Sequence, residues 1–194
     1  MTADYLDLRL GDFLEGLAGG TPAPGGASAA ALTATFAAGL VRMVARRSKG
    51  SWPEAAGIAA QAKALEGRMA PMALKTDEAW EAALEALQNA NGEGARGDEE
   101  LEEKLARSAE VPLDIAESAA DVASLAALTA ELGDGTFRSD AAAAAVLAAA
   151  ASRAGAHFVA VNLATRPDDE WLRRATVAAD SAAAAAARAL DAGP

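Results

Sequence analysis

The 194-residue chain has a formal net charge of −11, no cysteine and one histidine, which excludes disulfides, thiolate chemistry and a histidine-based metal cluster. Its acidic balance also disfavours binding to nucleic acid, which needs a basic surface. Hydrophobic residues make up 52% of the sequence and aromatic residues only 4%, and this alanine-rich composition favours closely packed helices. We therefore expect one all-α domain over residues 1–194.

The N-terminal stretch is polar and charged, unlike a signal peptide. The alanine runs are interrupted by charges too often to span a membrane. We expect a cytoplasmic protein with no membrane partner.

An amphipathic helix is predicted over Asp7–Ala18, with Leu10, Phe13, Leu14 and Leu17 on one side. A Gly/Pro-rich loop follows and leads directly into a long helix that ends near Ser48.

Residues 19–49 form the stretch around which the fold is expected to be organised: GGTPAPGGASAAALTATFAAGLVRMVARRSK. Pro24 fixes its own φ, whereas Gly25 and Gly26 permit conformations that other residues resist, so this loop can bring backbone close to a ligand. In the helix, one face carries larger apolar residues and another carries small ones. The two rows are Leu32, Phe36, Leu40 and Met43, and Gly26, Ala30, Ala34 and Ala38. A helix of this kind is expected to be buried on most sides and to be central.

Ser51 and Glu54 have the spacing of a capping box and predict a helix that runs to about Asn89. Pro71 should kink or split this helix, because its ring clashes with the carbonyl one turn back. The expected core row is Leu65, Met69, Met72, Thr76, Trp80, Ala83 and Leu87.

Residues 89–100 are polar and glycine-rich and predict a flexible loop. A short acidic helix over about Asp98–Ser108 comes next. Pro112 suits the first turn of a further helix, which ends near Leu132.

Residues 133–137 read as a turn, after which Ser139 can cap a helix that continues to about Ala164. Thr165 with Asp168 can cap the last helix, which should fray after Ala189. The whole pattern predicts a bundle of about five to six helices.

Asp77 is the first candidate for chemistry. Helical spacing places it near Ala73 and Trp80, at the shoulder of an apolar row. Partial burial of a carboxyl group favours its neutral form, which suits a general acid or base near neutral pH. The alternative is a solvated charge next to Lys75 and Glu78.

Three further polar positions have two interpretations each. Asp140, which follows Ser139, can stabilise the first turn of its helix or face a ligand. Ser28 can donate to a ligand or bond back to its own helix. Asn162 lies among apolar residues and can contact a ligand or tie two helices together.

Arg42, Arg46 and Lys49 share one helical face and form the densest basic cluster in the chain. They can hold an anion, or simply stabilise a helix C-terminus, which is the commoner reason for such a pattern. Lys75 and Arg138 are alternative anion contacts, because each lies near a candidate aspartate.

The segment TPAPGGASAAALTATFAAGLVRMVA resembles the signature of the formiminotransferase-cyclodeaminase C-terminal family, which includes stand-alone methenyltetrahydrofolate cyclohydrolases. Later segments resemble further parts of that family in the same order. These segments are LKTDEAWEAAL, VPLDIAESAADV, RSDAAAAAVLAAA and VNL. The resemblance therefore covers nearly the whole chain.

The resemblance implies an all-α homodimer that binds a tetrahydrofolate derivative in a groove and needs no metal. The implied reaction interconverts 5,10-methenyltetrahydrofolate and 10-formyltetrahydrofolate. Asp77 matches the family's proposed proton donor, and Asp140 and Asn162 would orient the reactants. The loop at Pro24–Gly26 would approach the pterin, and the basic cluster would be available to the glutamate carboxylates.

Two rival functions remain open. The cyclodeaminase reaction, which releases ammonia, would use the same proton donor, but the chain carries no transferase domain, and this favours the cyclohydrolase. A non-catalytic helical dimer with an inherited cleft is favoured by Ala27 and Phe158, which, like Asp134, depart from the family pattern. A purely structural bundle would leave the Gly/Pro-rich loop unexplained.

Overall fold

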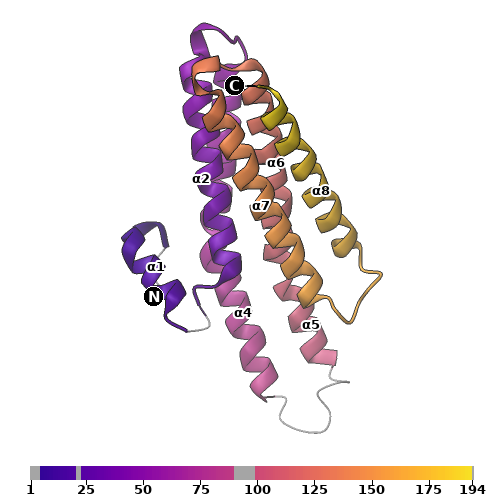
Figure 1. The fold of residues 1–194 in the computed structure, drawn as a ribbon. Helices are drawn as coiled ribbons and strands as arrows, with labels where there is room; N and C mark the ends of the chain where they lie inside the picture. Colours follow the sequence, from indigo (N-terminus) through magenta and orange to yellow (C-terminus); the bar gives the residue numbers. More distant parts are fainter. Residues whose placement is uncertain (1–4, 21–22, 90–98, 194) are drawn as a thin grey trace.

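The structure, a computed structural model, describes residues 5–20, 23–89 and 99–193, without side chains at 86–89 and 99–103. Within these ranges all regular structure is helical, with eight α-helices and three short 3₁₀ helices (Figure 1). The α-helices are α1 (Leu10–Ala18), α2 (Gly26–Arg47), α3 (Ala55–Met69), α4 (Met72–Asn89), α5 (Glu99–Ser108), α6 (Glu110–Leu132), α7 (Arg138–Asn162) and α8 (Glu170–Asp191). The 3₁₀ helices are η1 (Tyr5–Asp7), η2 (Ser48–Gly50) and η3 (Gly135–Phe137). The predicted all-α bundle is confirmed.

The four long helices α2, α6, α7 and α8 run side by side, and α7 packs against the other three (Figure 1). Helix α3 packs on α2 and α6, whereas α4 and α5 extend the bundle at the end where α2 begins and α7 ends. Helix α1 lies beside the first half of α2, away from the main bundle. The start of α2, the end of α7 and the start of α6 therefore meet at one end of the molecule.

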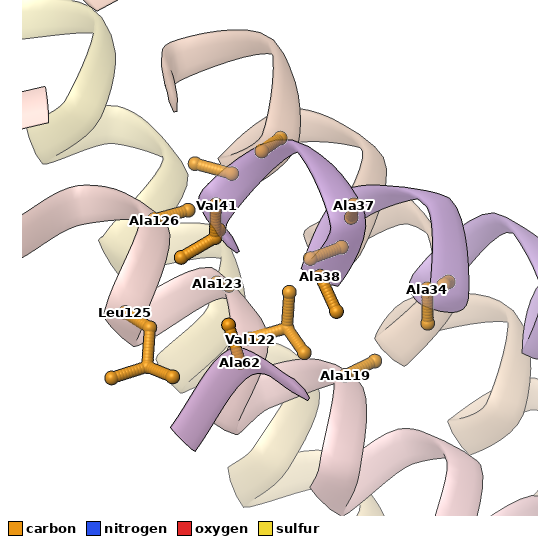
Figure 2. Close-up of a cluster of buried hydrophobic side chains, with 14 of the residues drawn as sticks. Ala34, Ala37, Ala38, Val41, Ala62, Ala119, Val122, Ala123, Leu125 and Ala126 are labelled. Carbon is orange, nitrogen blue, oxygen red and sulfur yellow. The ribbon is translucent and has the colours of Figure 1, made fainter. Parts of the chain in front are cut away.

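Small side chains fill the core between α2, α3 and α6 (Figure 2). Ala34, Ala38 and Val41 of α2 face Val122 and Ala123 of α6, and all five are fully buried. The prediction of α2 as a central small-residue helix is confirmed. Its row of larger residues is only partly buried, because the close approach of neighbouring helices uses the alanine face.

Pro71 splits the predicted third helix into α3 and α4, as expected. The predicted capping box at its start is wrong. Helix α3 begins at Ala55, Glu54 makes no capping hydrogen bond, and the Ser51 hydroxyl instead donates to the carbonyl of Ser48 at 3.2 Å. The preceding η2 turn uses this serine, so it is not available to the helix.

The middle of the chain matches its predicted pattern. Helix α5 coincides with the short acidic helix, and α6 ends at Leu132 with Pro112 in its first turn. The expected flexible loop at 89–100 lies mostly outside the described residues. The predicted capping role of Ser139 is wrong, because α7 begins one residue earlier, at Arg138, and continues directly from η3.

Two segments, Gly26–Gly50 and Gly135–Asn162, are long and apolar enough to cross a membrane by length and composition alone. Core helices of an alanine-rich bundle meet the same criterion. Both segments also pack against neighbouring helices of the bundle.

Helices α6 and α7 approach each other closely at Gly155. A Cβ atom built on this residue would lie 2.8 Å from the carbonyl oxygen of Pro112 and 2.9 Å from the nitrogen of Ala116. One turn earlier, the buried Ser152 hydroxyl donates to the carbonyl of Ala116 at 2.8 Å. This contact fixes the end of α7 against the start of α6.

Replacing Gly155 with alanine should destabilise the protein by about 1–3 kcal/mol, because the new methyl group meets backbone that cannot move independently. Equilibrium unfolding in urea measures this. The matched control is Gly67→Ala in α3, where a Cβ meets nothing within 4 Å; alanine there should stabilise by about 0.5–1 kcal/mol. Equal effects of the two substitutions would contradict the close contact.

The start of α8 differs from the predicted Thr165–Asp168 cap. Asp169 is the N-cap, and its carboxylate accepts a hydrogen bond from the N–H of Trp171 at 2.9 Å. Two successive turns, closed by the N–H groups of Arg166 and Asp169, carry the chain past Asp168 before the helix begins.

Asp169→Ala should therefore cost about 0.5–2 kcal/mol of unfolding free energy, the usual effect of losing an N-cap. Asp168→Ala removes an exposed carboxylate of the same turn and should change stability little. Thermal unfolding of both variants distinguishes the two caps. A larger loss of stability in Asp168→Ala than in Asp169→Ala would support the Thr165–Asp168 cap instead.

Candidate functional site

A cavity of about 350 Å³ opens at the end of the bundle where α2 and α6 begin and α7 ends. Its wall combines small, aromatic and polar residues from five helices and the loop before α2. The lining residues are Gly25, Gly26, Ala27, Thr76, Asp77, Trp80, Ser108, Pro112, Phe158, Val161 and Asn162. A mostly apolar pocket with a few converging polar groups is typical of a small-molecule site.

Asp77 on α4 is the acidic residue of this wall. The residue is only 5% exposed, and each of its carboxylate oxygens accepts a hydrogen bond from a hydroxyl group. The Ser28 hydroxyl donates to Oδ1 at 2.6 Å, and the Tyr5 hydroxyl donates to Oδ2 at 2.7 Å. Asp77 is therefore not a solvated surface charge, which was the alternative interpretation. Its carboxyl group is buried and held in a fixed orientation.

The Gly-rich loop explains how Ser28 reaches Asp77. Ser28 lies in the first turn of α2 and is fully buried, and its hydroxyl also accepts a hydrogen bond from the N–H of Gly25 at 3.3 Å. Gly25, Gly26 and Ala27 line the cavity at a helix N-terminus, where backbone N–H groups have no partner within the helix and favour an acceptor or anion. Pro24 precedes this turn and does not line the cavity.

Gly26 has no side chain where the phenyl ring of Phe158 packs over the start of α2. A Cβ at Gly26 would lie 2.9 Å from Cζ of that ring. Trp80, which is 37% exposed, supplies a second aromatic side chain to the wall. Two aromatic groups at one cavity suit a flat, unsaturated ligand.

Asn162 ends α7 and ties two helices together, as one of its two interpretations predicts, while contact with a ligand stays a prediction. Its side-chain amide donates to the carbonyl of Ser108 at 3.0 Å, which ties α7 to the end of α5, and the residue also lines the cavity. Its carbonyl oxygen can accept a second hydrogen bond, because the amide has separate donor and acceptor atoms.

Tyr5, Thr76 and Ser108 were not predicted as site residues. Tyr5 is held by the ring of Phe13, with centroids 5.3 Å apart in an edge-to-face arrangement. Burial, and then the hydrogen bond and negative charge of Asp77, raise the pKa of Tyr5 above the ordinary tyrosine value. The place of Thr76 in the predicted core row could have indicated that it lies near Asp77. No local pattern connects Tyr5 with Asp77, which lies 72 positions later in the chain.

Several predicted residues lie apart from this cavity. Arg138, Ser139 and Asp140 are at the start of α7, at the opposite end of that helix from Asn162. Lys75 is exposed on α4 and does not line the cavity. The structure does not bring these four residues to Asp77, and their roles stay predictions.

The basic cluster forms a separate groove between α2 and α3. Arg42, Arg46 and Lys49 line it together with Lys63, and Arg42 also pairs with Glu66 at 3.1 Å. Among the residues that the structure describes, no group of three His, Asp or Glu side chains could hold a metal ion.

Comparison with known proteins identifies the family of this chain. Residues 9–181 match the family model described as formiminotransferase-cyclodeaminase. A methenyltetrahydrofolate cyclohydrolase from Methylorubrum extorquens is 31% identical, over 77% of this chain and 76% of the relative. A formiminotetrahydrofolate cyclodeaminase from Thermotoga maritima has a similar crystal structure, with a TM-score of 0.84, 25% sequence identity and 96% of each chain covered. Since the family model spans most of the sequence, the chain belongs to the formiminotransferase-cyclodeaminase family, as its sequence signature predicted.

Proposed function

We propose that this protein is a methenyltetrahydrofolate cyclohydrolase, in which Asp77 is the general acid and base. The observation that carries the proposal is a buried carboxyl group, held by two hydroxyl donors, in the wall of a cavity with two aromatic side chains. The relative with 31% identity bears this name, which supports the choice of reaction.

The cavity chemistry suits 5,10-methenyltetrahydrofolate. Its methenyl carbon lies between two nitrogens and is therefore electrophilic enough for attack by water. Trp80 and Phe158 offer apolar contact to a flat ring system, and the N-terminus of α2 offers backbone donors to its polar edge. Asn162, with its amide fixed on Ser108, can present its carbonyl oxygen to a ring N–H group.

Asp77 would transfer one proton in each of two steps. As a base it takes a proton from the attacking water while the oxygen bonds to the methenyl carbon. As an acid it gives that proton to N5 while the bond between N5 and the carbon breaks. The remaining hydroxyl proton leaves to solvent as the formyl carbonyl forms, and the formyl group stays on N10.

The cyclodeaminase reaction is the second candidate, and the structural neighbour from Thermotoga maritima bears that name. In that reaction a formimidoyl group on N5 closes onto N10 and loses ammonia. The same carboxyl group would protonate the departing nitrogen. The higher identity to a cyclohydrolase favours the first candidate.

We also propose that the protein is a homodimer, supported by an exposed apolar surface on α2 and α7. Phe36 is 55% exposed and Leu147 is 38% exposed. The two helices are antiparallel, because Gly26 lies against Phe158 and Arg47 lies over the ring of Phe137. Phe36 and Leu147 are therefore at about the same level along the two helices. Val146 on α7 is also exposed, and Leu40 and Met43 on α2 are half-buried. Neighbouring exposed apolar side chains of this size are typical of a protein interface.

Asp77→Asn should lower kcat for hydrolysis of 5,10-methenyltetrahydrofolate by about 10²–10⁴-fold, because the amide cannot carry the proton. The loss of substrate absorbance, corrected for the spontaneous rate, measures this. The matched control is Glu78→Gln, which neutralises the next, exposed carboxylate of α4 and should leave the rate unchanged.

A fully active, folded Asp77→Asn variant would remove the central claim. If the wild-type protein does not accelerate hydrolysis, ammonia release from 5-formimidoyltetrahydrofolate tests the second candidate with the same variants. No turnover of either substrate would favour the non-catalytic alternative.

Phe36→Glu should convert the dimer to a monomer, because a charge would then lie in the apolar contact. Light scattering after size-exclusion chromatography measures the mass. Val177→Glu introduces the same charge on α8 at a residue that is 61% exposed and should leave the dimer intact. A monomeric wild-type protein, or a dimeric Phe36→Glu variant, would contradict this interface.

A further inference from the structure

Tyr5 contacts the central carboxyl group of the site from outside the cavity. Its hydroxyl is 2.7 Å from Oδ2 of Asp77, yet Tyr5 is not among the residues that line the cavity wall. We therefore expect this side chain to influence a ligand through Asp77.

The N-terminal segment is folded back to bring Tyr5 to this place. Phe13 of α1 is buried and holds the Tyr5 ring edge to face. Gly16 of the same helix lies against Pro24, since a Cβ built on it would be 3.2 Å from the proline ring. The segment from η1 to α1 is thus anchored both to the site and to the loop that opens α2.

The contact restricts the orientation of the carboxyl group. The terminal torsion of an aspartate is broad and has no sharp minimum, so a single hydrogen bond leaves the carboxyl plane free to rotate. Ser28 fixes Oδ1 and Tyr5 fixes Oδ2, and together they define that plane. Each oxygen keeps a second lone pair for a ligand.

The Tyr5 hydroxyl keeps its proton, and so remains a hydrogen-bond donor, at any pH near neutrality. Burial of the phenol raises the pKa of Tyr5 most. The hydrogen bond and charge of Asp77, and the carboxylates of Glu81 and Glu78, raise it further. Because all these effects favour the protonated phenol, the hydroxyl does not compete with Asp77 for a proton.

We propose that Tyr5 is a positioning residue, which orients the Asp77 carboxyl group for proton transfer and makes the N-terminal segment part of the functional site. The effect on turnover rests on the proposed function, whereas the contact with Asp77 can be tested without it.

A double-mutant cycle tests the effect on turnover. Tyr5→Phe keeps the ring against Phe13 and removes only the hydroxyl, and kcat should fall on the order of tenfold with little change in KM. In the Asp77→Asn background the same substitution should have almost no further effect, because Tyr5 acts through Asp77. Glu15→Gln, an exposed change in α1, should leave kcat unchanged. An unchanged kcat in Tyr5→Phe, or an equal loss in both backgrounds, would overturn the proposal.

A second readout needs no substrate. Tyr5 is the only tyrosine in the chain, so labelling tyrosine with ¹³C at Cζ gives one resonance in a nuclear magnetic resonance spectrum. In the wild-type protein this resonance should stay at its protonated position through the pH range around 10 where an ordinary tyrosine ionises. In Asp77→Asn it should begin to move at lower pH.

Identical titrations in the two proteins would overturn the contact itself, whatever the outcome with folate. If the tyrosine titrations of the wild-type protein and Asp77→Asn differ, but the wild-type protein turns over neither folate substrate, the proposed function fails. The anchoring of Asp77 by Tyr5 then still stands.

Discussion

The structure depends on the close approach of helix backbones that small side chains allow. Dispersion and hydrophobic gains per alanine are modest, so stability comes from many short contacts rather than from a few large residues. At Gly155 even a methyl group is too large, and the buried Ser152 hydroxyl uses the short separation to reach a carbonyl of the neighbouring helix. That contact places the start of α6, which carries Pro112, and the end of α7, which carries Asn162, at the cavity wall.

Four of the eight aromatic side chains gather at the cavity end of the bundle. Trp80 and Phe158 line the cavity, and Tyr5 pairs with Phe13 directly behind Asp77. Small and large side chains occupy different places for a physical reason. Large rings would separate the helices in the alanine core, but they can fill the irregular space where helices begin and end. A core of small residues and an aromatic-walled cavity are therefore two consequences of one packing arrangement.

Local signals in the sequence predicted most of the fold. The proline at position 71 splits a helix, the one at position 112 lies in a first turn, and the glycines at the start of α2 line the cavity. Asp77, Ser28 and Asn162 were also identified from their patterns and do meet at one end of the bundle. The errors have a common cause: helix starts at Ala55, Arg138 and Glu170 are set by the turns that precede them, and several capping residues compete there within a few positions. The contact between Tyr5 and Asp77 joins distant segments, and no spacing rule along one helix can reveal it.

The position of Tyr5 also distinguishes the two ends of the chain. The described N-terminal segment begins at the carboxyl group of the cavity, whereas α8 ends at the far end of the bundle, near the start of α7 (Figure 1). A polypeptide fused ahead of Tyr5 would therefore emerge next to the cavity, and one fused after α8 would emerge a whole helix length away. Purification tags and reporter domains belong at the C-terminal end, where they would lie away from the cavity.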